Sequence, residues 1–349
     1  MPQLLLRLPE VQPTTTQRPS ACPHCGCPTL QRWGQLKKPV KDTQLQQVSF
    51  YRYRCTDCGR TFRHYPSGCS RADQTERLRV VAVLAWCLGL SLRGVSLLLS
   101  GFGIAISWVT VWRDVQQLGS SLLADFGVRR GVRVVGVDGF YVRRRGLGKV
   151  GVVVAVDMGS GEPLALGYVG EQDVEALCAW LSPLVERYGI EVLVTDSLRS
   201  YQEVSARLGL AHQECQFHVR RWVGRALREL AGELEERWHW VLEEVRAIVE
   251  ALPADGGARL LEIWKQLPGR SGVVRGRLPA LVRLRDLVLR LSESWGRFVV
   301  FTRDSAVPRT NNGVERVIGR MQMRARTVRG YKSVEGMLHG LAVCGVQWW

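Results

Sequence analysis

Three acidic residues stand in contexts that suit metal ligation: Asp138 in VGVDGFYVR, Asp196 in LVTDS and Glu315 in TNNGVE. Each aspartate ends an apolar run rich in β-branched residues, which predicts a buried strand with the acid at its carboxyl end. Glu315 falls in the first turn of an expected helix that Asn311 or Asn312 caps. Catalytic groups collect at the carboxyl edge of open α/β sheets, so we expect the three carboxylates to meet there.

Bringing these carboxylates together is unfavourable unless cations accompany them. Two bare carboxylates about 4 Å apart repel by about 4 kcal/mol at an effective dielectric of about 20. Without a cation, such a site would take up protons or open. Hard divalent ions prefer oxygen ligands, and two of them can activate the attacking oxygen and stabilise the leaving oxygen in phosphodiester cleavage. The acids therefore predict a site for two Mg²⁺ or Mn²⁺ ions.

Other readings of the acidic residues stay open. A single aspartate at a strand end is more often a turn former or a helix cap than a metal ligand. Glu293, Asp304 and Glu335 are rival third acids. Asp157 also follows an apolar run, but its context DMGSG is typical of a hairpin turn, so we expect it to be structural.

The helix expected from Asn311 onwards carries a row of arginines beside an apolar stripe. The stripe, which includes Val314, Val317 and Ile318, would hold the helix against the sheet and set the position of Glu315. We expect the arginines to contact DNA phosphates, although such a row is often only a solvated face. These residues are Arg316, Arg320, Arg324, Arg326 and Arg329.

Two CxxC pairs lie near the N-terminus, Cys22 with Cys25 and Cys55 with Cys58. Each pair is a tight turn that aims two thiolates at one point, and two such turns complete a tetrahedral structural zinc site. Strand-like residues between the pairs make this segment resemble a zinc ribbon. The alternative is four reduced cysteines on a loop, and His24, Cys27, His64 and Cys69 are less favoured replacement ligands.

The segment from Asp73 to Gly119 predicts three short helices, with a glycine-containing turn at 101–103 between the second and the third. This is the layout of a helix-turn-helix, whose last helix enters the major groove of DNA. Ser107, Thr110 and Arg113 would be the outward residues of that helix. A plain helical bundle would show the same periodicity.

Composition and charge narrow the class of protein. The chain has 349 residues, 46% of them hydrophobic and 23% charged, as in ordinary soluble proteins. A formal net charge of +16 favours a polyanionic partner such as DNA. The longest apolar run is too short to span a bilayer, and the N-terminus lacks the pattern of a signal peptide. We therefore expect a cytoplasmic protein without a membrane partner, whose cysteines are thiols or metal ligands.

The order of the expected elements predicts five regions. Residues 1–20 form a flexible N-terminus, 21–70 a zinc ribbon and 71–120 the helix-turn-helix. Two hairpin strands followed by alternating helices and strands then predict a mixed α/β sheet. We assign this catalytic domain to residues 130–222 and 298–349, with an all-helical insertion at 223–297.

The sequence also resembles a known family. The contexts of Asp138, Asp196 and Glu315, the CQFH segment Cys215–His218 and the helical insertion together resemble the DDE transposases. The likeness is to bacterial insertion-sequence transposases of the Mutator-like type, which carry a Cys-x-x-His signature between the second Asp and the Glu. The zinc ribbon and helix-turn-helix resemble those of related insertion-sequence families. The catalytic resemblance covers about residues 130 to 345.

This resemblance implies a ribonuclease-H-like fold in which Asp138, Asp196 and Glu315 hold Mg²⁺. It implies hydrolysis at a transposon end to free a 3′ hydroxyl, which then attacks target DNA without a covalent protein intermediate. Transposases of this kind act as at least dimers on paired DNA ends. We expect Cys215 and His218 to support the active site structurally, because one Cys and one His cannot close a zinc site.

Two other functions fit the same motifs. The chain would be a DNA-binding regulator if the catalytic domain were an inactive transposase remnant, although all three acids are present. It would be a metal-dependent nuclease if the same site cut DNA without joining it. Tryptophans of the insertion, Trp238, Trp240, Trp264 and Trp295, could stack on an extruded base or could be core residues.

Overall fold

The computed structural model describes residues 8–125, 131–269 and 279–346. The chain divides into two compact units. The first, which we call the N-terminal unit, comprises Met1–Leu122, Met323–Val328 and Glu335–Trp349. The second, which we call the sheet unit, comprises Leu123–Gln322 and Arg329–Val334. No helix in the described ranges is both long enough and apolar enough to cross a bilayer.

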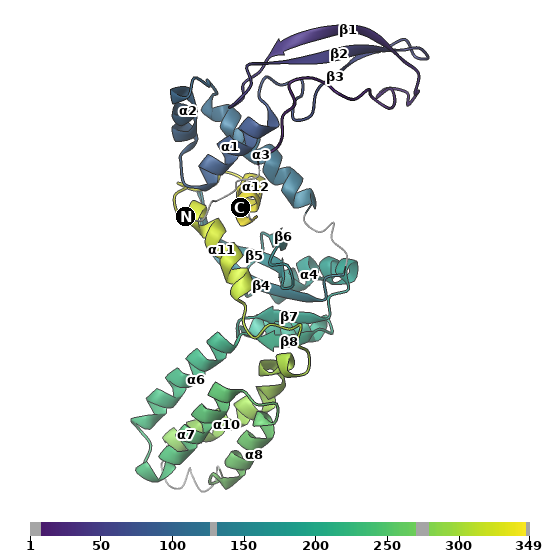
Figure 1. Cartoon of the computed structure of the whole chain (residues 1–349). Coiled ribbons are helices and arrows are strands. Elements are labelled where there is room, and N and C mark those ends of the chain that lie inside the picture. The colour runs from purple at the N-terminus through teal and green to yellow at the C-terminus, as the bar shows by residue number, and fades with distance from the viewer. Residues whose placement is uncertain (1–7, 126–130, 270–278, 347–349) are drawn as a thin grey trace, which may run out of the picture. The chain divides into compact units, whose positions relative to one another are not determined.

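The N-terminal unit begins with an antiparallel three-stranded sheet (Figure 1). Its strands are β1 (Leu30–Pro39), β2 (Gln47–Cys55) and β3 (Thr61–His64), in the order β1-β2-β3. A small core of Leu30, Tyr53 and the cysteine sulfurs lies under one face. So little apolar area cannot stabilise a sheet alone, so the cysteine site has to contribute to its folding.

The same unit contains the three predicted helices, α1 (Glu76–Cys87), α2 (Leu92–Gly101) and α3 (Trp108–Asp125). The side chains of Thr75 and Ser91 cap the first two helices. Gly103 adopts a φ of 76° in the turn before α3, a conformation that favours glycine. The structure therefore confirms three helices with a glycine turn between the second and the third.

The C-terminal helix α12 (Val334–Gly345) packs closely on α3. A Cβ atom at Gly119 would come within 2.3 Å of the backbone oxygen of His339, so the two helices touch at backbone level. The described residues 335–346 are thus grouped with the N-terminal unit, and the assignment of residues 298–349 to the catalytic domain stays a prediction. Residues 347–349 of that assignment lie outside the described residues.

The predicted flexible segment 1–20 is only partly described, because its first seven residues lie outside the described ranges. Val11 is buried, and the amide of Gln12 donates to the carbonyl oxygen of Ser67 at 3.1 Å. Thr14 forms a parallel bridge with Ser49 of β2. The described part of this segment therefore pairs with the ribbon, in contrast to the loose tail that its Pro- and Thr-rich composition suggests.

The sheet unit is built on a five-stranded mixed sheet in the order β6-β5-β4-β7-β8 (Figure 1). Its strands are β4 (Val134–Arg144), β5 (Gly148–Asp157), β6 (Pro163–Gly167), β7 (Val192–Thr195) and β8 (Ala211–Glu214). β4, β5 and β6 are antiparallel neighbours, whereas β7 and β8 run parallel to β4. This order and direction make the sheet ribonuclease-H-like, as expected. Helices α4 (Val174–Tyr188) and α5 (Arg199–Arg207) connect the parallel strands.

A helical region follows β8 in the chain. It contains α6 (Gln216–Ala231), the 3₁₀ turn Glu236–Trp238, α7 (His239–Ala251), α8 (Gly256–Gln266) and α10 (Pro279–Phe298). These helices share one apolar core, to which Trp295 and Phe298 contribute large buried side chains. Residues 270–278 lie outside the described ranges. After the 3₁₀ turn Val300–Thr302, α11 (Asn312–Ala325) carries Glu315 in its first turn.

Candidate active site

Strand register places Asp138 and Asp196 at the same level of the sheet. The parallel pairing of β4 with β7 joins Val134 to Val192 and Gly136 to Val194. Two further residues along each strand bring Asp138 opposite Asp196, and residues at the same level of neighbouring strands point to the same face. The two carboxylates therefore lie side by side where the parallel pairing stops.

The structure corrects one prediction about Asp138, which does not end its strand. β4 continues to Arg144, because its antiparallel pairing with β5 extends from Val135–Asp157 through Asp138–Val154 to Arg144–Gly148. Only the pairing with β7 ends before Asp138. Further along the chain, β8 ends at Glu214 and α6 begins at Gln216.

The start of α11 is fixed directly to β4. The Asn311 side-chain amide donates a hydrogen bond to the carbonyl oxygen of Val137 at 3.2 Å, and Asn311 is 1% exposed. Its backbone oxygen accepts hydrogen bonds from the amides of Val314 and Glu315. A Cβ atom at Gly136 would lie within 2.5 Å of a Val314 methyl group, so the helix needs a glycine here. Glu315 is thereby held one turn from the strand that carries Asp138.

Electrostatics show that the acidic side chains act on one another. Burial, followed by the negative charges of Glu171, Asp196 and Glu315, raises the pKa of Asp138 to about 7. The pKa of Asp196 is also raised, because burial outweighs the opposing effect of a hydrogen bond from the Leu198 amide to its Oδ1 at 3.0 Å. All three predicted acids therefore belong to one electrostatic cluster.

Glu171 is a fourth acid of this cluster, which the sequence did not single out. The Tyr201 hydroxyl donates to Glu171 Oε1 at 2.9 Å, and Tyr201 is 1% exposed. A Cβ atom at Gly139 would come within 2.3 Å of the Glu171 carboxyl carbon, so this carboxylate lies directly against β4. Burial and then the charge of Asp196 raise its pKa. Glu171 lies in the turn between β6 and α4. In the sequence, the only signal for it is its position after Gly170, just past the end of an expected strand.

The chemistry of these side chains suits hard divalent ions. Carboxylate oxygens are the ligands that Mg²⁺ prefers, and cations would remove the cost of deprotonating Asp138. Among the described residues, the four CxxC cysteines form the group of metal-ligating side chains whose ligand atoms all lie within 4.8 Å of one another, and the acids form no such group.

Cys215 and His218 lie on either side of the start of α6. Cys215 is fully buried, and its amide donates to the carbonyl oxygen of Thr195 at 2.8 Å, which ties α6 to β7. His218 Nε2 lies 3.6 Å from Glu315 Oε1, and the charge of His218 lowers the pKa of Asp196. His218 therefore faces the acids, whereas Cys215 belongs to the packing beneath them.

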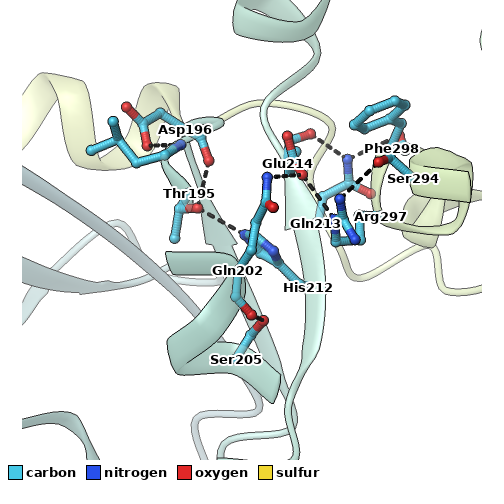
Figure 2. A network of polar contacts seen from close by, with 11 residues as sticks. Thr195, Asp196, Gln202, Ser205, His212, Gln213, Glu214, Ser294, Arg297 and Phe298 are labelled. Atoms are coloured by element: carbon cyan, nitrogen blue, oxygen red, sulfur yellow. Dashed lines mark hydrogen bonds and ion pairs between the residues drawn. The ribbon is translucent and has the colours of Figure 1, made fainter. Parts of the chain in front are cut away.

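A network of polar contacts that includes Asp196 lies at the ends of β7 and β8 (Figure 2). The Thr195 hydroxyl donates to the carbonyl oxygen of Asp196 at 2.7 Å, so His212 Nε2, at 2.8 Å, donates to the hydroxyl. Burial lowers the pKa of His212 to about 3, which keeps the imidazole neutral. Arg297 Nε donates to Glu214 Oε1 at 2.9 Å and joins α10 to β8. The network therefore fixes the backbone that presents Asp196.

The four predicted zinc ligands meet at one point in the N-terminal unit. Cys22 and Cys58 sulfurs lie 3.8 Å apart, and those of Cys25 and Cys55 lie 3.6 Å apart. Four thiolates about 2.3 Å from a tetrahedral Zn²⁺ would be about 3.8 Å from one another. Hydrogen bonds from the backbone amides of Cys58 and Asp57 lower the pKa of Cys55 to about 6, although burial raises it. The lowered pKa favours the thiolate form of Cys55. The cluster therefore fits a structural Zn²⁺ ion.

The expected outward residues of α3 are only partly free. Ser107 and Arg113 are exposed, and Thr110 is partly buried. Ser107 Oγ accepts a hydrogen bond from the Thr110 amide at 3.1 Å, so this side chain also caps the helix. Buried Asp114, held by Gln74 at 2.7 Å, fixes the opposite face of α3 to the start of α1.

The predicted arginine row divides into exposed and buried members, and Arg326 and Arg329 lie beyond the end of α11 at Ala325. Arg316, Arg326 and Arg329 are exposed, and Arg320 is partly buried. Arg324 is 5% exposed; its guanidinium donates to the carbonyl oxygen of Gly89 at 3.1 Å and lies 4.6 Å from the Trp86 ring centroid. Tertiary packing inside the N-terminal unit therefore uses the Arg324 guanidinium, and its expected contact with DNA phosphates stays a prediction.

Two of the competing acids, Asp304 and Asp157, have hydrogen-bond partners outside the acid cluster. Asp304 accepts a hydrogen bond from Arg133 at 2.6 Å, and Asp157 caps the Gly159 amide in a hairpin turn, as expected. Trp295 is buried and donates to the Pro253 carbonyl oxygen at 2.8 Å, so it is a core residue. Trp264 packs under Arg285, whereas Trp240 is 39% exposed.

Comparisons with known proteins give a family match over part of the chain. Residues 181–338, which include Asp196 and Glu315 but not Asp138, match the model of the family described as Transposase IS66 family. No curated protein sequence matches the chain. The match names a transposase family, as the resemblance implied, but not the Mutator-like type.

Two solved structures are also similar to the chain. One is the catalytic core domain of BIV integrase, at 18% identity and a TM-score of 0.21, covering 30% of this chain and 75% of that one. The other is the Drosophila P element transposase strand transfer complex, at 12% identity and a TM-score of 0.27, covering 76% of this chain and 78% of that one. Of these comparisons, the family match ties residues 181–338 to transposases of the IS66 family.

Proposed function

We propose that this protein is an insertion-sequence transposase that cleaves DNA ends and joins them to a target by a two-metal mechanism. The observation that carries the proposal is the convergence of Asp138, Asp196 and Glu315 on one electrostatic cluster, in which the pKa of Asp138 rises to about 7. A site with this property gains most from divalent cations. The family match over residues 181–338 supports transposition among the reactions open to such a site.

In this proposal the acidic side chains hold two Mg²⁺ or Mn²⁺ ions, which supply charge neutralisation and Lewis acidity at a phosphodiester. Asp138 and Asp196 present carboxylates from adjacent strands, and Glu315 presents a third from α11. Glu171 adds negative charge from the far side of β4 and keeps its orientation through Tyr201. His218 lies against Glu315 at 3.6 Å and limits the positions open to that carboxylate.

The N-terminal unit would recognise the DNA. The ribbon, with Zn²⁺ on Cys22, Cys25, Cys55 and Cys58, and the helix-turn-helix, with Ser107, Thr110 and Arg113, are separate from the acids in sequence. The positive charge of the chain favours phosphate contacts, and the exposed arginines Arg316, Arg326 and Arg329 remain candidates for them.

Three further points stay predictions: the domain boundaries given above, the cytoplasmic location and the action of a dimer on paired DNA ends.

The function is tested with purified full-length chain, Mg²⁺ or Mn²⁺, and labelled DNA that carries the end of the element that encodes it. Joined products are expected for a transposase. Cut products without joining would instead indicate a nuclease, and a shifted but intact DNA band would indicate a DNA-binding regulator. Asp138→Asn, Asp196→Asn and Glu315→Gln should each abolish chemistry and leave DNA binding in place. Normal cleavage by the Asp138→Asn variant would overturn the site assignment.

A further inference from the structure

A groove next to the acid cluster carries a stripe of cationic side chains that the sequence did not single out. We call it the α6 groove; it has a volume of about 580 Å³. Asp196–Leu198 line it on one side, and His218, Arg221, Trp222, Arg225 and Arg228 line it on the other. One end of the groove thus reaches a proposed metal ligand, while the rest is basic.

The basic side chains of the groove form one line because of the helical repeat. His218, Arg221, Arg225 and Arg228 recur every three or four residues and so share one face of α6. The opposite face, which includes Val223 and Leu227, is buried in the helical core, so the basic face points away from that core. Helix amphipathicity therefore fixes the direction of the arginines.

Few acidic side chains neutralise these arginines. Arg225 pairs with Glu229 at 3.0 Å, but both side chains are largely exposed and such pairs contribute little. Arg221 and Arg228 are exposed and make no ion pair or hydrogen bond with any residue in the described ranges. Aligned cations at the edge of a groove form a site for a polyanion rather than for a neutral ligand.

The length of the stripe fits a nucleic-acid strand. Ten residues separate His218 from Arg228, which corresponds to about 15 Å along a helix at 1.5 Å per residue. One DNA strand advances by about 3.4 Å per phosphate, so the stripe spans about four phosphates. Trp222 also lines the groove, and the Arg290 guanidinium lies 5.2 Å from its ring centroid. The exposed arginines of the stripe are the groups that would bind anions.

We propose that the α6 groove binds the sugar–phosphate backbone of the DNA strand on one side of the scissile phosphate, through Arg221 and Arg228. This inference rests on the proposed function, because the strand must pass the acids to be cut. The contact is independent of base sequence, because guanidinium groups meet phosphates and not base edges. It would therefore hold the strand in register with Asp196 for any flanking DNA.

The first test measures binding without chemistry. Full-length Arg221→Gln/Arg228→Gln is titrated with random-sequence 30-base-pair DNA at several NaCl concentrations, beside the single control Arg259→Gln and wild type. Arg259 is an exposed arginine of α8 outside the groove. Loss of two phosphate contacts should lower the slope of log K against log salt by about 1.8, while the control lowers it by less than about 0.5. An unchanged slope in the double variant would overturn the proposal.

The second test locates the contact directly. Phenylglyoxal modification of wild-type arginines is read by peptide mass spectrometry with and without a 20-nucleotide DNA strand. Arg221 and Arg228 should be protected at least about threefold, and Arg259 should not. Inorganic phosphate at the same total phosphate concentration should protect none of them, because a single anion lacks the multiple contacts. Equal protection by phosphate would indicate a small-anion site instead.

These outcomes separate the groove from the proposed function. Protection and a lowered slope in a protein that neither cuts nor joins DNA would leave the groove standing and reject the transposase. If the wild-type protein joined DNA but its Arg221 and Arg228 were not protected, the transposase function would stand and the role of the groove would be rejected.

Discussion

The Asn311 side chain, at the start of α11, is hydrogen-bonded to the backbone oxygen of Val137 at 3.2 Å, one residue before Asp138. This contact joins two segments that lie 174 residues apart in the chain. It transmits the position of β4 to the helix that carries Glu315. The distance between two of the proposed metal ligands therefore depends on a residue that binds no metal.

We expect Asn311→Ala to reduce DNA cleavage more than it reduces folding. The buried Val137 carbonyl would lose its side-chain partner, which costs about 1–3 kcal/mol. The start of α11 would also lose its attachment, so Glu315 would be poorly placed. Asn312→Ala is the matched control, because Asn312 is exposed and adjacent. Urea unfolding and cleavage rate should both be measured; equal activity of the two variants would contradict the role of Asn311.

The raised pKa of Asp138 predicts a pH-dependent penalty in metal-free protein. The carboxyl titrates near 3.8 when unfolded and at about 7 when folded, so the folded state binds more protons in between. The contribution of the Asp138 carboxyl to the free energy of unfolding is therefore largest below pH 3.8 and is lost as the pH rises through about 7. Asp138→Asn removes the penalty, which is roughly 4 kcal/mol at most.

Thermal unfolding at pH 8 in buffer without Mg²⁺ should therefore show Asp138→Asn to be more stable than wild type. Adding Mg²⁺ should raise the melting temperature of wild type and have a smaller effect on the variant, because a ligand that binds the folded state stabilises it. A variant that is less stable than wild type without Mg²⁺ would show that ionised Asp138 does not destabilise the folded state.

Glu171 should matter for metal affinity although the sequence did not identify it. Glu171→Gln keeps the volume and an acceptor for the Tyr201 hydroxyl but removes the charge beside Asp138. Changes next to metal ligands typically cost 10- to 100-fold in metal affinity, so the Mg²⁺ concentration for half-maximal cleavage should rise by about tenfold or more. Glu186→Gln, an exposed acid on α4, should leave it unchanged. Identical Mg²⁺ curves for both variants would exclude Glu171 from the site.

The cysteine cluster predicts about one zinc ion per chain in addition to any ion at the acids. Cys22→Ser should abolish the zinc content measured by elemental mass spectrometry and weaken DNA binding, because the ribbon depends on the metal to fold. Cys178→Ser on α4 is the control, since that thiol lies outside the cluster. Full zinc content in the Cys22 variant would show that its ligands are not those inferred here.

Local sequence determined much of this protein. The two CxxC turns, the three helices from 76 to 125 and the strands around Asp138 and Asp196 follow from patterns within about ten residues. The basic row of α6 is also present in the sequence, but nothing local shows that its arginines border Asp196.

Tertiary structure decided the rest, because the deciding contacts join distant segments. Pairing between β4 and β7 puts Asp138 level with Asp196, and the fold brings Glu171 against Gly139 and buries Arg324 beside Trp86. A strand's length depends on its longest partner, so β4 runs past Asp138. A charge's role depends on what packs around it, and no periodicity of the chain itself contains that information.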